Sequence, residues 1–191
     1  RDPDPAYLNL SRLAEEEQQY DQALDWLRRV RSPEQMLTVR IRQAFVTAKA
    51  GSVPEALKLL QEGKSDSADD RIQLVLAQGQ ILRDAHRYQE SYDVLAKELA
   101  AAPDDSNLLY ETAMSAERVD RIDVMETHLR RLLKLRPDFA HAYNALGFTF
   151  ADRNIRLQEA YELIDKALQL APDDGFILDS MGWVQFRLGN L

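Results

Sequence analysis

The sequence has no cysteine, and glycine and proline occur only seven times each among its 191 residues. The absence of cysteine excludes a disulfide framework and thiolate metal sites. No apolar run approaches the roughly 20 residues that a membrane-spanning helix needs. Acidic residues outnumber basic ones, and the net charge of −8 argues against a nucleic-acid binder, whose phosphate contacts require a basic face.

The remaining composition is that of a helix-rich globular protein, with 45% hydrophobic and 8% aromatic residues. The chain begins at Arg1 rather than at a methionine, and it ends at Leu191 directly after a helix-end signal, Leu188-Gly189-Asn190. We therefore expect a fragment of a longer protein, so the lack of a signal peptide says nothing about the compartment.

The clearest pattern lies in 141–172, where apolar residues recur at helical spacing on either side of a short polar turn. Each half has one apolar face, which predicts two amphipathic helices joined by a tight turn. The positions that carry this pattern are Tyr143, Leu146, Gly147 and Phe150, then Ala160, Ile164 and Ala167, closed by Pro172.

Small residues repeat with the same period along the whole chain. In the first helix of each pair they are Ser11, Ala44, Gly79, Ala113, Gly147 and Gly182, at intervals of 33, 35, 34, 34 and 35 residues. The matching positions of the second helices are Ala23, Ala56, Ser91, Met125 and Ala160. Small residues at these positions allow two helix backbones to cross closely, and the large Met125 departs from the pattern.

This order of residue types resembles the tetratricopeptide repeat, which has a period of about 34 residues. The resemblance implies an all-α, right-handed solenoid in which stacked helix pairs share one core. We expect one domain over 1–191, with five repeats and a lone helix. The expected repeats are 5–37, 38–72, 73–106, 107–140, 141–175 and a partial repeat at 176–191.

The expected helices lie at about 6–17, 20–30, 34–50, 53–62, 71–85, 88–101, 106–118, 121–135 and 175–188, beside the pair in 141–172. Residues 1–5 are expected to be extended, because each proline disfavours helix at the residue before it. In the first helix Leu8, Leu10 and Leu13 are expected to face inward. Ser32, Ser52 and either Asp69 or Asp70 are expected to cap the helices that follow them.

No residue constellation indicates catalysis, a metal or a cofactor. The three histidines, His86, His128 and His141, lack metal-ligand spacing and are expected in turns or facing solvent. The aspartate pairs stand where helices begin, so capping explains them. We therefore predict a non-catalytic protein without metal or cofactor. The basic residues of 130–136 alternate with leucines and are expected on a solvated outer face.

The resemblance also implies that the first helices line a concave groove that binds a partner protein or peptide. The side chains expected there combine apolar anchors with polar groups that hydrogen-bond the partner backbone. An alternative for each apolar residue is packing against the neighbouring repeat. A clamp for a carboxyl terminus is not expected, because Asn144 has no Lys–Asn network around it. The candidate partner-binding residues are Phe45, Gln80, Arg83, Tyr110, Met114, Asn144, Phe148, Trp183, Phe186 and Arg187.

A second resemblance covers the run NALGFTFADR…EAYELIDKALQLAPDDGFILDSMGWVQFRLGN, which looks like proteobacterial periplasmic repeat lipoproteins of the outer membrane. One such lipoprotein is an adaptor that gathers substrates for a carboxyl-terminal processing protease. The resemblance implies a scaffold in the periplasm, held at the outer membrane only by a lipid anchor outside these residues; the alternative is the cytoplasm. Two other hypotheses stay open: a docking arm of a larger enzyme, and a self-assembly module that dimerises through Trp183, Val184 and Leu188.

Overall fold

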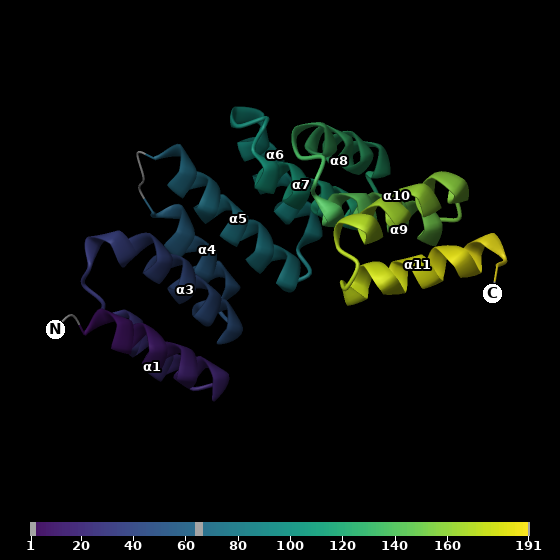
Figure 1. Ribbon diagram of the computed structural model, residues 1–191. Helices are drawn as coiled ribbons and strands as arrows, with labels where there is room; N and C mark the ends of the chain where they lie inside the picture. Colours follow the sequence, from purple (N-terminus) through teal and green to yellow (C-terminus); the bar gives the residue numbers. More distant parts are fainter. Residues whose placement is uncertain (1–2, 64–66, 191) are drawn as a thin grey trace. The chain divides into compact units, whose positions relative to one another are not determined.

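The computed structural model describes residues 3–63 and 67–190, and these residues form eleven α-helices and no strand (Figure 1). The predicted all-α class is confirmed. The chain divides into two compact units, Arg1–Glu98 and Leu99–Leu191, with the boundary inside α6. The helices are α1 (Asp4–Glu16), α2 (Tyr20–Leu27), α3 (Met36–Lys49), α4 (Val53–Gln61), α5 (Ala68–Asp84), α6 (Tyr88–Ala101), α7 (Ser106–Arg118), α8 (Ile122–Leu135), α9 (Ala140–Asp152), α10 (Leu157–Leu170) and α11 (Gly175–Leu188).

The first unit is built from the hairpins α1–α2 and α3–α4, followed by α5 and the greater part of α6. Its apolar side chains form one cluster around Leu27 and Val46 and another around Leu60 and Ile81. Asp4, only 3% exposed, accepts hydrogen bonds from the backbone nitrogens of Arg31 and Ser32 at 2.9 and 2.7 Å. This carboxylate therefore ties the start of α1 to the connection between α2 and α3.

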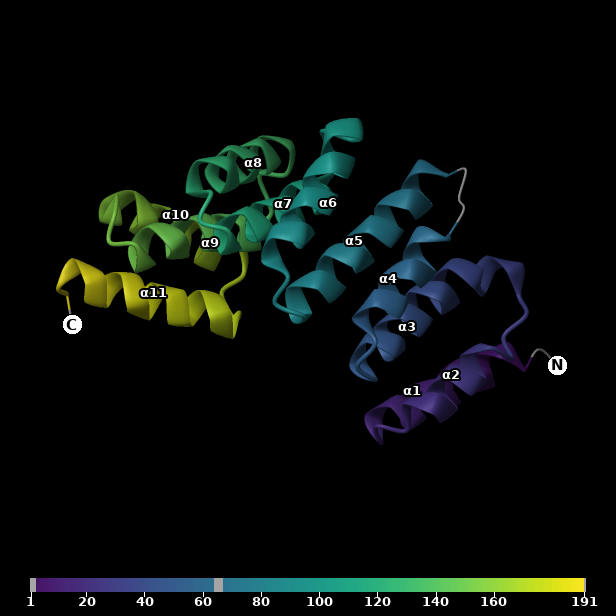
Figure 2. The same ribbon diagram turned by 180° about the vertical axis from the view of Figure 1, so that it is seen from behind.

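The second unit contains the hairpins α7–α8 and α9–α10 and the single helix α11. Helix α9 packs against both α10 and α11, as the view from behind also shows (Figure 2). Leu129, Leu146, Phe150 and Ile164 are completely buried in this unit. None of the helices in the described ranges is both long and apolar enough to span a bilayer.

The predicted crossing positions are buried in every complete helix pair. A methyl group added to Gly147 would come within 2.7 Å of the Ile164 side chain and 2.8 Å of the Ala160 carbonyl oxygen. The hydroxyl of Ser91 donates to the Gly79 carbonyl at 2.9 Å across the α5–α6 crossing. These contacts explain the small residues at Gly147 and in the α5–α6 crossing, whereas the large Met125 is also completely buried at the equivalent position of α8.

A second periodic feature lies seven residues after each small residue of a first helix. The backbone there adopts a left-handed conformation, which turns the chain directly into the next segment. Glycine tolerates this conformation, and Asn and Asp are the next most tolerant residues. The six positions are Gln18, Gly51, His86, Asp120, Asn154 and Gly189, with φ between 56° and 100°.

The beginning of the chain differs from the prediction. Helix α1 begins at Asp4, so residues 3–5 are not extended, while residues 1–2 lie outside the described ranges. Pro5 fits in the first turn, where no backbone donor is needed. Leu10 and Leu13 do not face inward, since they are 38% and 49% exposed. The buried face instead contains Ser11 and Ala14, which directly follow Leu10 and Leu13 in the sequence.

Several helix ends also differ from the prediction. Neither Ser32 nor Ser52 makes a side-chain capping bond, and a 3₁₀ turn (Pro33–Gln35) precedes α3. Helix α2 ends at Leu27 rather than near residue 30. Helix α5 starts three residues earlier than expected, and its cap is Ser67, whose hydroxyl accepts from the Asp70 backbone nitrogen at 3.4 Å. Position 70 therefore lies inside the helix instead of capping it.

Candidate functional site

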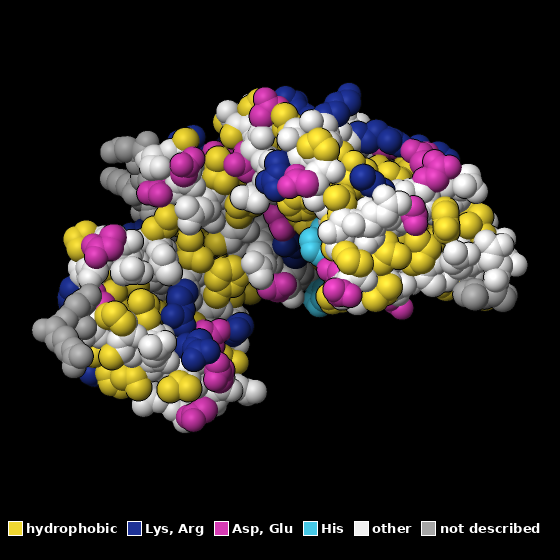
Figure 3. All heavy atoms as spheres, viewed as in Figure 1, with side chains coloured by type: hydrophobic (Ala, Val, Ile, Leu, Met, Phe, Trp, Pro, Cys, Tyr) yellow, Lys and Arg dark blue, Asp and Glu magenta, His cyan; other side chains and the backbone are white. Residues whose placement is uncertain are grey.

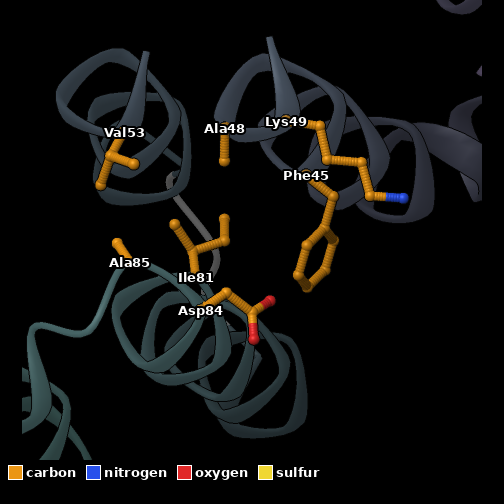
Figure 4. Close-up of a pocket in the computed structure, with 7 residues that line it drawn as sticks. All are labelled: Phe45, Ala48, Lys49, Val53, Ile81, Asp84 and Ala85. Atoms are coloured by element: carbon orange, nitrogen blue, oxygen red, sulfur yellow. The ribbon is translucent and has the colours of Figure 1, made fainter. Parts of the chain in front are cut away.

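Consecutive first helices leave a hollow in each unit. In the first unit the hollow has a volume of about 320 Å³ and lies between α3 and α5 beside the start of α4. Figure 4 shows Phe45 and Ala48 on α3 facing Ile81 on α5, with Lys49 and Asp84 at the edge. Lys49 is already engaged, because its ammonium lies 2.6 Å from a carboxylate oxygen of Glu15.

The hollow of the second unit lies between α9 and α11 and has a volume of about 520 Å³. Its apolar wall consists of Phe148, Leu178, Trp183 and Phe186, and exposed hydrophobic side chains gather over α11 in Figure 3. The rings of Trp183 and Phe186 stack, with their centroids 5.6 Å apart and their planes inclined by 24°. Gly182 widens the hollow, because it has no side chain and no atom within 4 Å of where one would begin.

Helical spacing places these side chains on one side of α9 and α11. Positions 148 and 152 are one turn apart on α9, and positions 179, 183 and 186 follow the i, i+4, i+7 spacing on α11. The cap of α11 holds its first turn, since the Asp174 carboxylate accepts from the backbone nitrogens of Phe176 and Ile177 at 2.9 and 3.2 Å. The hollow therefore lies between two regular helices.

Arg187 joins α11 to the end of α9 beside this hollow. Its guanidinium carbon lies 5.5 Å from the centroid of the Trp183 ring, a cation–π geometry. Its Nη2 atom donates to the backbone carbonyl of Asp152 at 3.3 Å. Arg187 is thus a supporting residue for the aromatic wall, besides being a predicted partner-binding residue.

The structure brings together only some of the ten predicted site residues. Phe148, Trp183 and Phe186 line one hollow, and Arg187 supports it. Phe45 lines the hollow of the other unit. The remaining predicted residues lie outside both linings: Gln80 and Arg83 on α5, Tyr110 and Met114 on α7, and Asn144 on α9.

Tyr110 illustrates the alternative of internal packing. Its ring lies 5.4 Å from that of Phe139, which precedes α9, so the side chain is partly used inside the second unit. Met114 is likewise half-buried. Within the described ranges, the amide Oδ1 of Asn144 and the indole Nε1 of Trp183 are buried and have no hydrogen-bond partner.

The sequence prediction did not include Asp152, Leu178 and Asp179, which also line the hollow of the second unit. Asp152 lies one turn after Phe148 on α9 and Asp179 one turn before Trp183 on α11, whereas Leu178 lies about two turns before Phe186. Both aspartates are exposed, and in the described part of the chain neither carboxylate has an ion pair or a hydrogen bond.

Several carboxylates elsewhere in the second unit are paired. Glu126 on α8 accepts from Arg156 at 2.6 Å and from Arg130 at 2.7 Å. The hydrogen bond from Arg156 is the main cause that lowers the pKa of Glu126 from 4.5 to about 2. Arg130 also pairs with Glu159, and Arg131 pairs with Asp104 at 2.7 Å. Arg130 and Arg131 on α8 are therefore engaged in ion pairs, which argues against a free basic patch there.

The titratable groups suggest no further chemistry. His86 and His141 are exposed, whereas His128 is half-buried rather than solvent-facing. Burial, reinforced by the charge of Arg131, lowers the pKa of His128. Among the described residues there is no group of three or more side chains that could hold a metal ion.

Similarity searches relate the chain to repeat proteins. No model of a known protein family matches it. The TPR repeat-containing protein PA4667 of Pseudomonas aeruginosa PAO1 is 42% identical over 188 residues, which make up 98% of this chain and 32% of that protein. The chain thus spans about a third of the length of this curated relative.

Solved structures share the fold at low sequence identity. YrrB, described as a TPR protein with an unusual peptide-binding site, has a TM-score of 0.63 at 18% identity, covering 92% of this chain and 90% of YrrB. MamA of Desulfovibrio magneticus RS-1 has a TM-score of 0.62 at 18% identity, covering 92% and 98%. The first TPR of Spaghetti (RPAP3), bound to the HSP90 peptide SRMEEVD, has a TM-score of 0.57 at 19% identity, covering 62% and 93%.

Proposed function

We propose that the chain is a non-catalytic tetratricopeptide-repeat scaffold that binds a segment of a partner protein against its first helices. The hollow between α9 and α11 is the proposed principal contact site. Two of the solved structures that share its fold are described by the peptides they bind or by their peptide-binding site, which supports this class of function.

The observation that carries the proposal is the exposed aromatic wall. Phe148 is 40% exposed and Phe186 is 56% exposed, although both belong to helices with well-filled buried faces. Grouped exposed apolar side chains are typical of interaction sites, and aromatic residues commonly supply most of the binding energy. Because the wall is formed by regular helices, binding would require little ordering of the scaffold itself.

The unpartnered polar atoms nearby support the same proposal. A buried polar group without a hydrogen bond costs on the order of 1–3 kcal/mol, so such groups call for an explanation. The indole Nε1 of Trp183 and the amide oxygen of Asn144 are a donor and an acceptor of this kind in the described ranges. We propose that small side-chain rotations on binding pair them with the backbone of the guest segment.

Quantitative affinity capture from an extract of the native organism tests this function. The variant Phe148→Ala with Phe186→Ala removes two exposed aromatic rings of the hollow. The matched control, Leu135→Ala with Leu170→Ala, removes two side chains of similar exposure, 44% and 37%, from the second helices α8 and α10. We expect at least one protein to be captured at least tenfold less by the hollow variant than by the control. Identical capture profiles for two folded variants would refute the hollow as the site.

We further propose that the scaffold acts in the periplasm as an outer-membrane adaptor that gathers substrates for a protease. The support is the resemblance of residues 144–190 to periplasmic repeat lipoproteins. Fractionation of native cells with an antibody against this chain provides the test. The proposal expects the protein in the outer-membrane fraction, whereas recovery from the cytoplasm would exclude this location.

A further inference from the structure

We infer that the hollow between α9 and α11 selects a partner segment carrying a basic side chain, arginine or lysine, next to apolar residues. This inference rests on the proposed function and adds the chemistry of the guest. It is carried by the two carboxylates at the hollow, Asp152 on α9 and Asp179 on α11, which stand beside three aromatic rings.

The two carboxylates are available to a guest. Neither has an ion pair or a hydrogen bond in the described part of the chain, and both side chains are exposed. In the described part of the chain Arg187 forms no ion pair with either carboxylate; its Nη2 atom donates to the backbone carbonyl of Asp152 and its guanidinium lies over Trp183. The carboxylates of Asp152 and Asp179 are therefore available to form an ion pair with a basic side chain of a guest segment.

The aromatic wall suits the same guest. A guanidinium or ammonium group is attracted to the face of an aromatic ring, most strongly to tryptophan, and its aliphatic stem packs well on apolar surface. A carboxylate beside the ring adds a charge-assisted hydrogen bond, which is roughly twice as strong as a neutral one. The chain itself already uses this contact, since Arg187 lies 5.5 Å from the Trp183 centroid.

The hollow of the first unit lacks this arrangement and provides an internal comparison. It has one aromatic ring, Phe45, and its two charged groups are of opposite sign, Lys49 and Asp84. A cationic guest there would approach the ammonium of Lys49. The charge complementarity to a basic segment thus belongs to the hollow between α9 and α11, and an acidic segment would meet like charge at Asp152 and Asp179.

Selection from a random dodecapeptide library displayed on phage tests the inference with the whole chain as target. Peptides that bind the chain but lose binding to the Phe148→Ala, Phe186→Ala variant are assigned to the hollow. We expect these peptides to be enriched in arginine or lysine beside aromatic or aliphatic residues, relative to the unselected library. Replacing the basic residue by glutamine in a synthetic copy should weaken binding about tenfold at low salt.

Two charge variants complete the test. Asp152→Asn with Asp179→Asn should weaken the selected peptides about tenfold, whereas Asp123→Asn with Asp173→Asn should leave their affinity unchanged. The control pair is also exposed and lies in the same unit, so both variants change the net charge equally. Thermal melting of both variants establishes that they are folded.

The outcomes separate the inference from the function on which it rests. If hollow-dependent peptides are found without basic residues, or bind equally well to the Asp152→Asn, Asp179→Asn variant, the inference is wrong and the scaffold function stands. If no selected peptide depends on Phe148 and Phe186, both the inference and the proposed site fail.

Discussion

Gly147 lies where α9 crosses α10, and the contacts there leave no space for a side chain. An added methyl group would meet the backbone carbonyl of Ala160 at 2.8 Å, which only a backbone shift can relieve. We expect Gly147→Ala to destabilise the chain by roughly 1–3 kcal/mol through overpacking, measured by urea unfolding.

Gly182 is the matched control for this substitution. It occupies the same position of its repeat, but nothing lies within 4 Å of where its side chain would begin. Gly182→Ala should therefore stabilise α11 by about 0.5–1 kcal/mol through helix propensity. Equal effects of the two substitutions would show that close crossing does not explain the periodic small residues.

Glu126 should make stability depend on pH. Its pKa in the folded chain is about 2 against an ordinary 4.5, so its contribution is complete above pH 4.5 and is lost as the pH falls from about 4.5 towards 2. The fall in pKa corresponds to roughly 3 kcal/mol, and the partial exposure of Arg130 and Arg156 reduces this to about 1–2 kcal/mol.

The comparison of wild type with Glu126→Gln by urea unfolding at pH 7, 4.5 and 3 measures this contribution. We expect the variant to be less stable by about 1–2 kcal/mol at pH 7 and the difference to shrink steadily below pH 4.5. A difference that is the same at pH 7 and pH 3 would mean that the ion pairs with Arg130 and Arg156 do not stabilise the fold.

Residues differ in how well their burial or their position at a hollow could be predicted from the sequence. Small residues at helix crossings follow from spacing alone, because backbone approach allows nothing larger there. The inward face of α1 was predicted only in part: Ser11 is buried and Leu8 packs against the core, whereas Leu10 and Leu13 are exposed. Asp152 and Asp179 were missed because the polar residues that reach a hollow depend on how two helices pack, which a single helical pattern does not specify.

At the scale of elements, the helices themselves were predictable and their caps less so. Apolar periodicity locates a helix, whereas a cap depends on the φ and ψ of one residue. Ser52 has the right residue type, but its backbone lies at φ −107° and ψ 74° and its side chain makes no capping bond. Asp174 has an extended backbone at φ −76° and ψ 113° and caps α11 with two hydrogen bonds.

This contrast predicts unequal effects of two similar substitutions. Asp174→Ala should cost about 1 kcal/mol, because it leaves two backbone donors at the start of α11 without their acceptor. Ser52→Ala should change stability by less than about 0.5 kcal/mol, because no capping bond is lost. Thermal unfolding of both variants measures the two losses in stability. A larger loss of stability for Ser52→Ala than for Asp174→Ala would contradict the capping assignment.

At the scale of the whole molecule, the repeat period predicted the all-α architecture. Within each unit, neighbouring helix pairs pack against one another, so a local pattern carried along the chain specifies most of the fold of each unit. The division into the units Arg1–Glu98 and Leu99–Leu191 was not predicted, because the boundary falls within α6 at no proline, glycine or change in composition. The compartment, the enzyme-arm hypothesis and the self-assembly hypothesis stay predictions, since they depend on residues or partners beyond this chain.

The fluorescence of Trp183 tests the central claim most directly. The chain has two tryptophans, and Trp26 lies in the first unit, where it stacks on Tyr7 at 5.8 Å. Trp26→Phe keeps a ring for this stacking and leaves Trp183 as the reporter in the hollow. Titration with a library-selected peptide should shift or quench the emission of Trp183. The midpoint of this change should equal the midpoint of binding measured by the fluorescence anisotropy of a labelled copy of the peptide. Saturated anisotropy with unchanged Trp183 emission would place the guest elsewhere and contradict the account.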